Sequence, residues 1–179
     1  FLRLKPSRVV PNLYLAPNTL TQRMEGPACS GYICMDLSKM KDGDCAGLAA
    51  FNGVSGVLTV KKNGKKLTLE MSEQKVTLTE REKAVTNVDE KIIETVDITK
   101  LVNAKQPKIW LRLDGKFRPG QRGGRDAANF FYSFDGGQWM QIGTKDYRMV
   151  FDYRRFFMGT KFGIFNYATK NTGGYVDVD

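Results

Sequence analysis

The chain has 179 residues, 41% of them apolar and 26% charged, and carries a formal net charge of +9 at pH 7. This composition is typical of one globular domain, and no apolar run approaches the length of a membrane span. The sequence contains no histidine. That excludes a Ser-His-Asp triad, a Cys-His pair and a histidine general base, so any catalysis would depend on carboxylates.

Neither end of the sequence has the features of a natural terminus. It begins at Phe1 without an initiator methionine or a signal peptide, and it stops at Asp179 within the alternating run YVDVD. We therefore expect residues 1–179 to form a single module that belongs to a longer polypeptide.

The positive charge is spread along the chain. Lysine and arginine outnumber aspartate and glutamate by 28 to 19, and no helical stripe collects them. A solvated basic surface is therefore favoured over a face that binds nucleic acid or a membrane, although a basic domain for acidic polymers remains an alternative. The densest groups are Lys61, Lys62, Lys65 and Lys66 in one turn, and Arg118, Arg122 and Arg125 in a glycine-rich loop.

The three cysteines, Cys29, Cys34 and Cys45, are odd in number and lack the spacing of metal ligands. With no histidine to complete a zinc site, we assign no metal-binding residue and expect no disulfide framework. No cofactor motif is present, and we expect none to be bound.

Residues 9–17, VVPNLYLAP, are the first distinctive segment. Two prolines and the lack of a clean alternation predict an extended loop, whose apolar side chains would need a partner surface to cover them. We interpret the segment as a candidate docking loop. Replacing Tyr14, its only aromatic residue, with alanine is expected to change the stability of the module only slightly.

Period-two alternation dominates the next part of the chain. It appears at residues 33–38 and 67–72, where each run offers one buried and one wetter face. In VLTVKKNGKKLTLEM, the Asn63-Gly64 dipeptide separates two such runs, which predicts a hairpin with positive φ at both turn positions.

The segment EREKAVTNVDEKIIETV, residues 80–96, fits both a helical stripe and a strand pattern. Its β-branched residues and the Thr86-Asn87 pair favour a strand, a turn and a second strand.

Residues 109–117, IWLRLDGKF, alternate again. The apolar side chains of this run share one face, and Trp110, Arg112 and Asp114 share the other. A flat aromatic ring beside charged groups suits a pyranose, which has an apolar C–H face and a polar edge. These three residues are candidate sugar-binding residues, the alternative being that Trp110 lies under a loop.

The glycine-rich stretch GKFRPGQRGGRD, residues 115–126, lacks the strand, motif and helix of a phosphate-binding loop. The following FYSFDGGQWMQIG predicts a second hairpin around residues 133–139, a turn similar to an Asp-box but one residue short. Asp135 is expected to form the turn and Trp139 to lie in the core.

No carboxylate pair stands out as catalytic. The five candidates all lie where turns or strand ends need an aspartate, so we expect no catalytic residue and no self-contained active site. They are Asp114, Asp126, Asp135, Asp146 and Asp152.

Together these runs and turns predict an all-β sandwich of two antiparallel sheets. Five ordered motifs add a family resemblance: LTQRMEGP, DGDCAGLAAFN, IWLRLDGKF, FFYSFDGGQW and MGTKFGIFNYATKNTGGYVDVD. Across nearly the whole chain they resemble the C-terminal β-sandwich of family-43 glycoside hydrolases of the β-xylosidase and α-L-arabinofuranosidase type.

The resemblance implies a concanavalin A-like jelly roll attached to a five-bladed propeller that carries the catalytic carboxylates. It also implies that a loop ahead of a segment similar to NTLTQRMEG places an aromatic residue at the rim of the substrate pocket, and Tyr14 matches that position. The implied substrate is plant polysaccharide such as xylan or arabinoxylan, and the implied location is secreted or periplasmic.

The sequence therefore predicts a non-catalytic accessory sandwich that docks on a catalytic propeller in the same polypeptide and completes its pocket. Two further interpretations stay open: an independent carbohydrate-binding module that uses Trp110, Arg112 and their neighbours, and a basic interaction domain. An autonomous enzyme is disfavoured.

Overall fold

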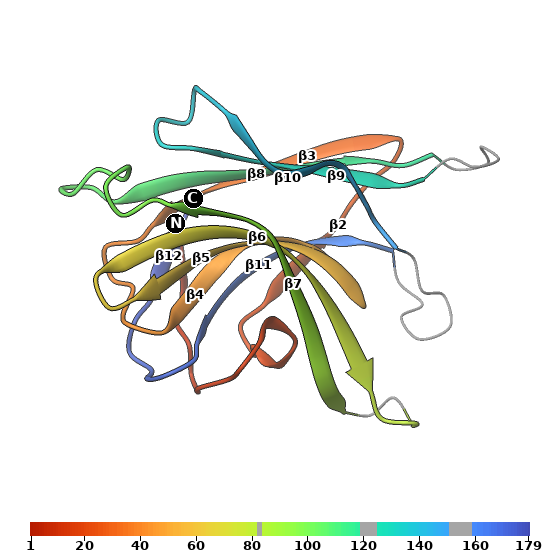
Figure 1. Cartoon of the computed structure of the whole chain (residues 1–179), viewed down its shortest axis with the longest axis horizontal. Helices are drawn as coiled ribbons and strands as arrows, with labels where there is room; N and C mark the ends of the chain where they lie inside the picture. Colours follow the sequence, from red (N-terminus) through yellow and green to blue (C-terminus); the bar gives the residue numbers. More distant parts are fainter. Residues whose placement is uncertain (82–83, 119–124, 151–158) are drawn as a thin grey trace.

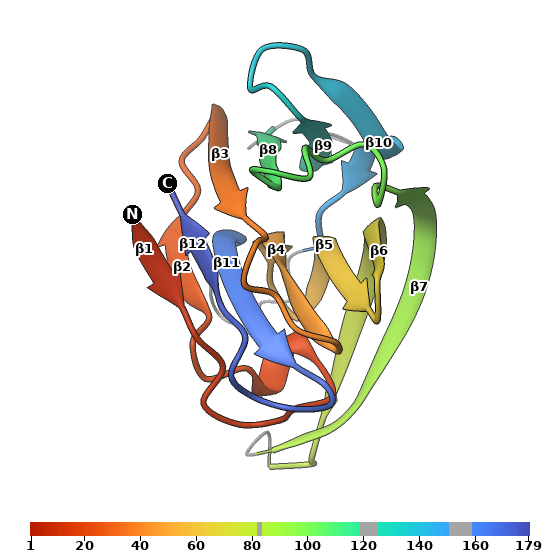
Figure 2. The ribbon, with the colours of Figure 1, turned by 90° about the vertical axis from the view of Figure 1, so that its left-hand side faces the viewer.

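The computed structural model describes residues 1–81, 84–118, 125–150 and 159–179. Two six-stranded antiparallel sheets stack on one another, as predicted (Figures 1 and 2). The first sheet has the order β1 (Leu2–Leu4), β12 (Val176–Val178), β3 (Ala28–Asp36), β8 (Lys108–Lys116), β9 (Ala127–Ser133) and β10 (Met140–Arg148). The second has the order β2 (Leu20–Arg23), β11 (Lys161–Ala168), β4 (Asp44–Phe51), β5 (Val54–Asn63), β6 (Lys66–Leu78) and β7 (Val85–Asp97).

The main core lies between the two sheets and follows the alternation of the strands. In β8, the side chains of Ile109, Leu111 and Leu113 are 0% exposed, while the residues between them face outward. Leu48 of β4 and Leu58 of β5 meet them from the second sheet. Burying each such side chain contributes about 1.5–3 kcal/mol, so the period-two pattern fixes which face of each strand turns inward.

Both predicted hairpins are present, but the turn of the first is displaced by one residue. Asn63 pairs with Lys66, so the two central positions are Gly64 and Lys65. Only Gly64 takes a positive φ, at 59°. The expectation of positive φ at Asn63 is wrong, because the paired strands extend one residue further than the dipeptide signal implied.

The turn predicted at Thr86-Asn87 is also wrong. Both residues lie within β7, which runs unbroken from Val85 to Asp97. Asn87 pairs with Thr77 of β6, and Thr86 is the extra residue at a register shift, because Val85 is the next residue that pairs, with Leu78. Two register shifts in this ladder bend the pair without a reversal of the chain. Thr86 and Asn87 remain in the strand because the pairing of β7 with β6 outweighs their local preference for a turn.

A second, smaller core lies on the other face of the second sheet. Residues 9–16 cross that face, and the short 3₁₀ helix η1 (Leu13–Leu15) lies below the sheet in Figure 1. Val10 and Leu13 are 5% and 1% exposed and pack on Phe165 and neighbouring side chains. The expected exposure of apolar side chains in residues 9–17 is therefore wrong for these two residues, because the module's own sheet covers them.

The cysteines are free thiols. Cys29 and Cys34 lie on β3 and are partly exposed, and Cys45 on β4 is buried. Burial raises the pKa of the Cys45 thiol to about 11.

Candidate functional site

Tyr14 is held from both ends. Its ring lies 5.5 Å from that of Phe51, and its hydroxyl reaches into the turn between β4 and β5. There the hydroxyl oxygen lies 2.8 Å from the carbonyl oxygen of Asn52, 2.8 Å from Oγ of Ser55 and 3.1 Å from the carbonyl oxygen of Gln74. Burial raises the pKa of Tyr14 above the normal tyrosine range, so the hydroxyl stays protonated.

The segment around Tyr14 is fixed as well. Oδ1 of Asn12 accepts a hydrogen bond from the amide of Leu15 at 3.2 Å, which caps η1, and Leu13 anchors the helix in the second core. Tyr14 is thus a half-buried residue on a preorganised helix. The small change in stability expected for Tyr14→Ala assumed that Tyr14 is a surface residue without anchoring contacts. The contacts described here contradict that assumption.

The candidate sugar-binding residues share the outer face of the first sheet. Nε and Nη2 of Arg112 donate to the two carboxylate oxygens of Asp114 at 2.8 and 2.7 Å, forming a bidentate pair. Oγ of Ser30 donates to the same carboxylate at 2.6 Å. Hydrogen bonding to Asp114 raises the pKa of Arg112, so its guanidinium is a fixed cation.

Trp110, on the same face of β8, is covered by a loop. A Cβ atom placed on Gly136 would lie 3.1 Å from Nε1 of Trp110, so the turn at residues 133–139 rests directly on the indole. The alternative in which Trp110 lies under a loop therefore describes the structure. Its indole supports the turn, while Arg112 and Asp114 remain part of the outer face.

Sequence reasoning missed the aromatic residues that do line this face. Tyr32 on β3 is 68% exposed and pairs in register with Arg112, which pairs in turn with Phe131. Trp139 lies edge-on to Tyr32 at 6.5 Å, and the guanidinium of Arg112 lies 5.7 Å from the Trp139 ring. The alternation of β3 already predicts that Tyr32 faces outward, since Ile33 and Met35 face inward. The contact between Tyr32 and Trp139 could not be predicted, because it depends on how distant strands pair in the sheet.

The turn at residues 133–139 has the role expected of it. Oδ1 of Asp135 accepts hydrogen bonds from the amides of Gly137 and Gln138, both at 2.8 Å. These bonds lower the pKa of Asp135. Trp139 differs from the prediction of a core residue, because it is half-buried on the outer face of the sheet.

The other carboxylates that fall on described residues also make structural bonds. Asp126 accepts from the amide of Arg118 at 3.0 Å, and Asp146 accepts from Nδ2 of Asn129 at 3.0 Å. Asp152 lies outside the described residues. Within the described ranges, no three His, Cys, Asp or Glu side chains form a group that could hold a metal ion.

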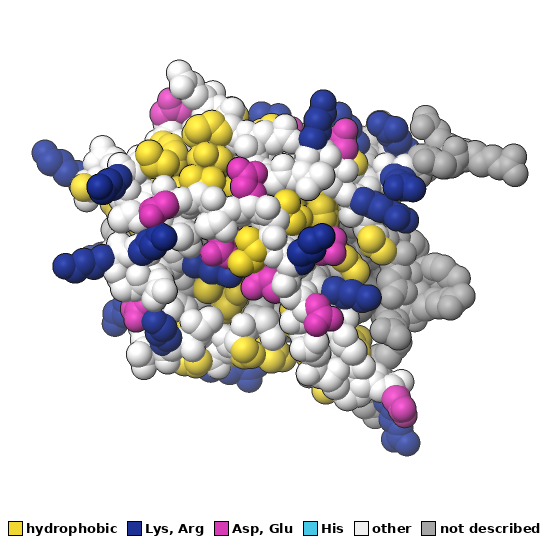
Figure 3. Space-filling view, viewed as in Figure 1, with side chains coloured by type: hydrophobic (Ala, Val, Ile, Leu, Met, Phe, Trp, Pro, Cys, Tyr) yellow, Lys and Arg dark blue, Asp and Glu magenta, His cyan; other side chains and the backbone are white. Residues whose placement is uncertain are grey.

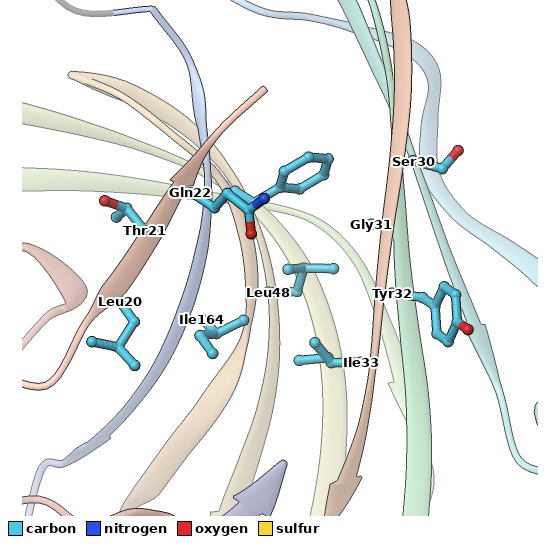
Figure 4. A pocket seen from close by; sticks show the side chains of 10 residues that line it. Leu20, Thr21, Gln22, Ser30, Gly31, Tyr32, Ile33, Leu48 and Ile164 are labelled. Carbon is cyan, nitrogen blue, oxygen red and sulfur yellow. The ribbon is translucent and has the colours of Figure 1, made fainter. Parts of the chain in front are cut away.

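An apolar cleft of about 340 Å³ opens between β2 and β3 (Figure 4). Leu20 and Gln22 form one wall, and Ile33 lies on the opposite strand with Leu48 and Ile164 deeper in (Figure 4). The side chain of Tyr32 points away from the cleft toward the outer face. Tyr32 thus contributes to the edge of the cleft while its ring lies on the outer face, so the cleft and the outer-face aromatic residues are adjacent surfaces that meet at β3.

On the face in Figure 3, lysine and arginine are dispersed, with aspartate and glutamate among them. Nζ of Lys61 lies 2.7 Å from Oε2 of Glu70, and Lys66 and Lys170 have acidic partners as well. No helix in the described part of the chain is long and apolar enough to cross a membrane.

Comparison with known proteins identifies the family to which the chain belongs. The model of the β-xylosidase C-terminal concanavalin A-like domain matches residues 1–179. A search of curated proteins found no match.

Two solved structures are similar over 98% of the chain. One is an engineered family-43 glycoside hydrolase described as having both endo-xylanase and exo-arabinofuranosidase activity, with a TM-score of 0.82 and 32% identity. The other is a bifunctional family-43 protein with a further CE part from Bacteroides eggerthii, with a TM-score of 0.76 and 33% identity. A family-43 protein from Bacteroides ovatus shares the fold, with a TM-score of 0.60 at 12% identity.

The chain spans only 32% and 20% of the length of the first two proteins. In such relatives the sandwich is therefore one part of a larger chain. The whole-length match, the two stacked antiparallel sheets and the two similar structures lead to one assignment: the chain belongs to the family of β-xylosidase C-terminal concanavalin A-like domains.

Proposed function

We propose that this module is a non-catalytic accessory sandwich of a glycoside hydrolase that acts on plant cell-wall polysaccharide such as xylan or arabinoxylan. It docks on a catalytic propeller in the same polypeptide and completes the substrate pocket of that domain. The supporting observation is its coverage of about a third and a fifth of two family-43 chains, together with carboxylates that are engaged in turns and structural bonds.

Tyr14 is the residue we propose for the pocket rim. A pocket wall positions a sugar only if it is itself rigid, and the ring of Tyr14 is fixed by Phe51 on one side and by its hydroxyl contacts on the other. It is also only half-buried, which leaves part of the ring available to a neighbouring domain.

Activity of the isolated and full-length proteins tests this function. The isolated module should hydrolyse neither an aryl xyloside nor an aryl arabinofuranoside. In the full-length enzyme, Tyr14→Ala should lower kcat/KM about ten- to hundredfold on both small and polymeric substrates, because the wall that orients the sugar is lost.

Trp110→Ala is the matched control, since it removes a half-buried aromatic residue on the other sheet. It should leave hydrolysis of the small aryl glycoside unchanged at a temperature where both variants are folded. Full activity of the Tyr14 variant on both substrates would remove the pocket role of this residue. Turnover by the isolated module that depends on one aspartate would overturn the non-catalytic assignment.

A second candidate function is polysaccharide binding on the outer face of the first sheet. It is favoured by the 68% exposure of Tyr32, beside Trp139 and the Arg112–Asp114 pair. Together they combine an aromatic surface for the C–H groups of a pyranose with fixed donors and acceptors for its hydroxyls.

Affinity electrophoresis in xylan or arabinoxylan measures this binding directly. Tyr32→Ala should abolish retardation of the isolated module, while Tyr14→Ala should not change it. Equal mobility of the wild-type module with and without polysaccharide would exclude the second function.

A further inference from the structure

The cleft between β2 and β3 lies where two strand edges are unpaired. β2 is the terminal strand of the second sheet, and β12 pairs in register only with Met35 and Asp36 of β3. Among the residues that the structure describes, no strand adds to the outer edge of β2 or to the remaining edge of β3, residues 28–33. An open strand edge is a template for another strand, and natural proteins normally cover it.

The direction of the unpaired backbone groups on β3 follows from one hydrogen-bonded pair. The amide and carbonyl of Cys34 bond to Asp179, at 2.8 and 3.0 Å, on the β12 side. In an antiparallel ladder, alternate residues direct both groups to the same side. The amides and carbonyls of Tyr32 and Ser30 therefore face the open edge, whereas those of Gly31 and Ile33 face β8.

The cleft beside this edge is an extension of the main core. Ile33, Phe162 and Ile164 line it and also pack against the buried cluster between the sheets. One end is closed by the ring of Phe162, which lies so close to Gly31 that a Cβ atom there would be 2.9 Å from it. On the second sheet, Leu20 contributes a side chain that is 46% exposed.

We propose that a further strand of the same polypeptide, outside residues 1–179, fills this cleft and hydrogen-bonds to β3 in line with β12. Val176 and Val178 of β12 are 0% and 5% exposed, so a strand in the same line would direct every second side chain into the cleft. Those side chains would be apolar and would join the main core. The intervening side chains would lie on the outer face beside Tyr32.

Two observations favour the same polypeptide over a second copy or another protein. The cleft is continuous with the main core, so its occupant would be a permanent part of the fold. In addition, this chain spans only 32% and 20% of two related chains, which have further polypeptide to supply such a strand. The inference is independent of the role proposed for Tyr14.

Amide hydrogen exchange followed by NMR tests the proposal without any variant. Comparison of residues 1–179 with the full-length protein should show rapid exchange at Ser30 and Tyr32 in the former and strong protection in the latter. Gly31 and Ile33 are the internal controls, because their amides face β8 and should be protected in both proteins.

Three results would overturn the proposal. Rapid exchange at Ser30 and Tyr32 in the full-length protein would show that no strand covers the edge. Protection in residues 1–179 that rises with protein concentration would identify a second copy as the occupant, and protection there at every concentration would place the cover within the module. None of these results changes the activity expected of the Tyr14 variant, so failure here is distinct from failure of the proposed function.

Discussion

Removal of one oxygen atom, in Tyr14→Phe, should destabilise the isolated module measurably. The ring and its packing on Phe51 are retained, but the hydroxyl contacts with Asn52, Ser55 and Gln74 are lost. The hydroxyl has one proton to donate, so its removal leaves one partly buried acceptor without this donor, which costs about 1–3 kcal/mol. For a domain of this size each kcal/mol lowers Tm by about 2–4 °C, so a central loss of about 2 kcal/mol predicts a decrease of about 4–8 °C.

Thermal and urea unfolding of the two proteins provide the measurement. Tyr32→Phe is the matched control, because it removes a hydroxyl from a tyrosine that is 68% exposed and should change the free energy of unfolding by less than about 0.5 kcal/mol. A double-mutant cycle with Ser55→Ala should show a coupling of at least about 0.5 kcal/mol. If Tyr14→Phe is as stable as wild type, the hydroxyl does not anchor η1 and the argument for a rigid pocket wall fails.

A glycine substitution and a cysteine-labelling experiment test the packing of strand β4 in the second sheet. Gly47→Ala should cost about 3 kcal/mol of unfolding free energy, because a Cβ atom there would overlap the main chain of β5. Gly159→Ala should be nearly neutral by the same measurement, because no atom of the described residues lies within 4 Å of the added Cβ. Iodoacetamide labelling at pH 8, followed by mass spectrometry, should modify Cys29 but not Cys45. Burial raises the pKa of Cys45 to about 11, so its thiolate forms only as the pH rises toward that value. Labelling of Cys45 at pH 8 in the folded protein would contradict its burial.

The sequence alone was sufficient for the alternating strands β3, β6 and β8 and for their inward faces. Burial of alternate residues produces a period of two, so the inward face of β8 and the strong turn signals near Gly64 and Asp135 could be read locally. Local reading failed where pairing overrode it. Thr86 and Asn87 have turn preferences, but Asn87 pairs with Thr77 of the neighbouring strand β6, and Thr86 is accommodated as an extra residue within β7.

Tertiary structure decided what each outward residue does. Trp110 and Tyr32 both face away from the core by parity, yet Gly136 rests on the indole while the ring of Tyr32 stays open. Likewise, the polar contacts of Tyr14 come from residues such as Ser55, 41 positions further along the chain. Alternation reports the side of a strand on which a residue lies, but only long-range pairing determines which distant segment covers it.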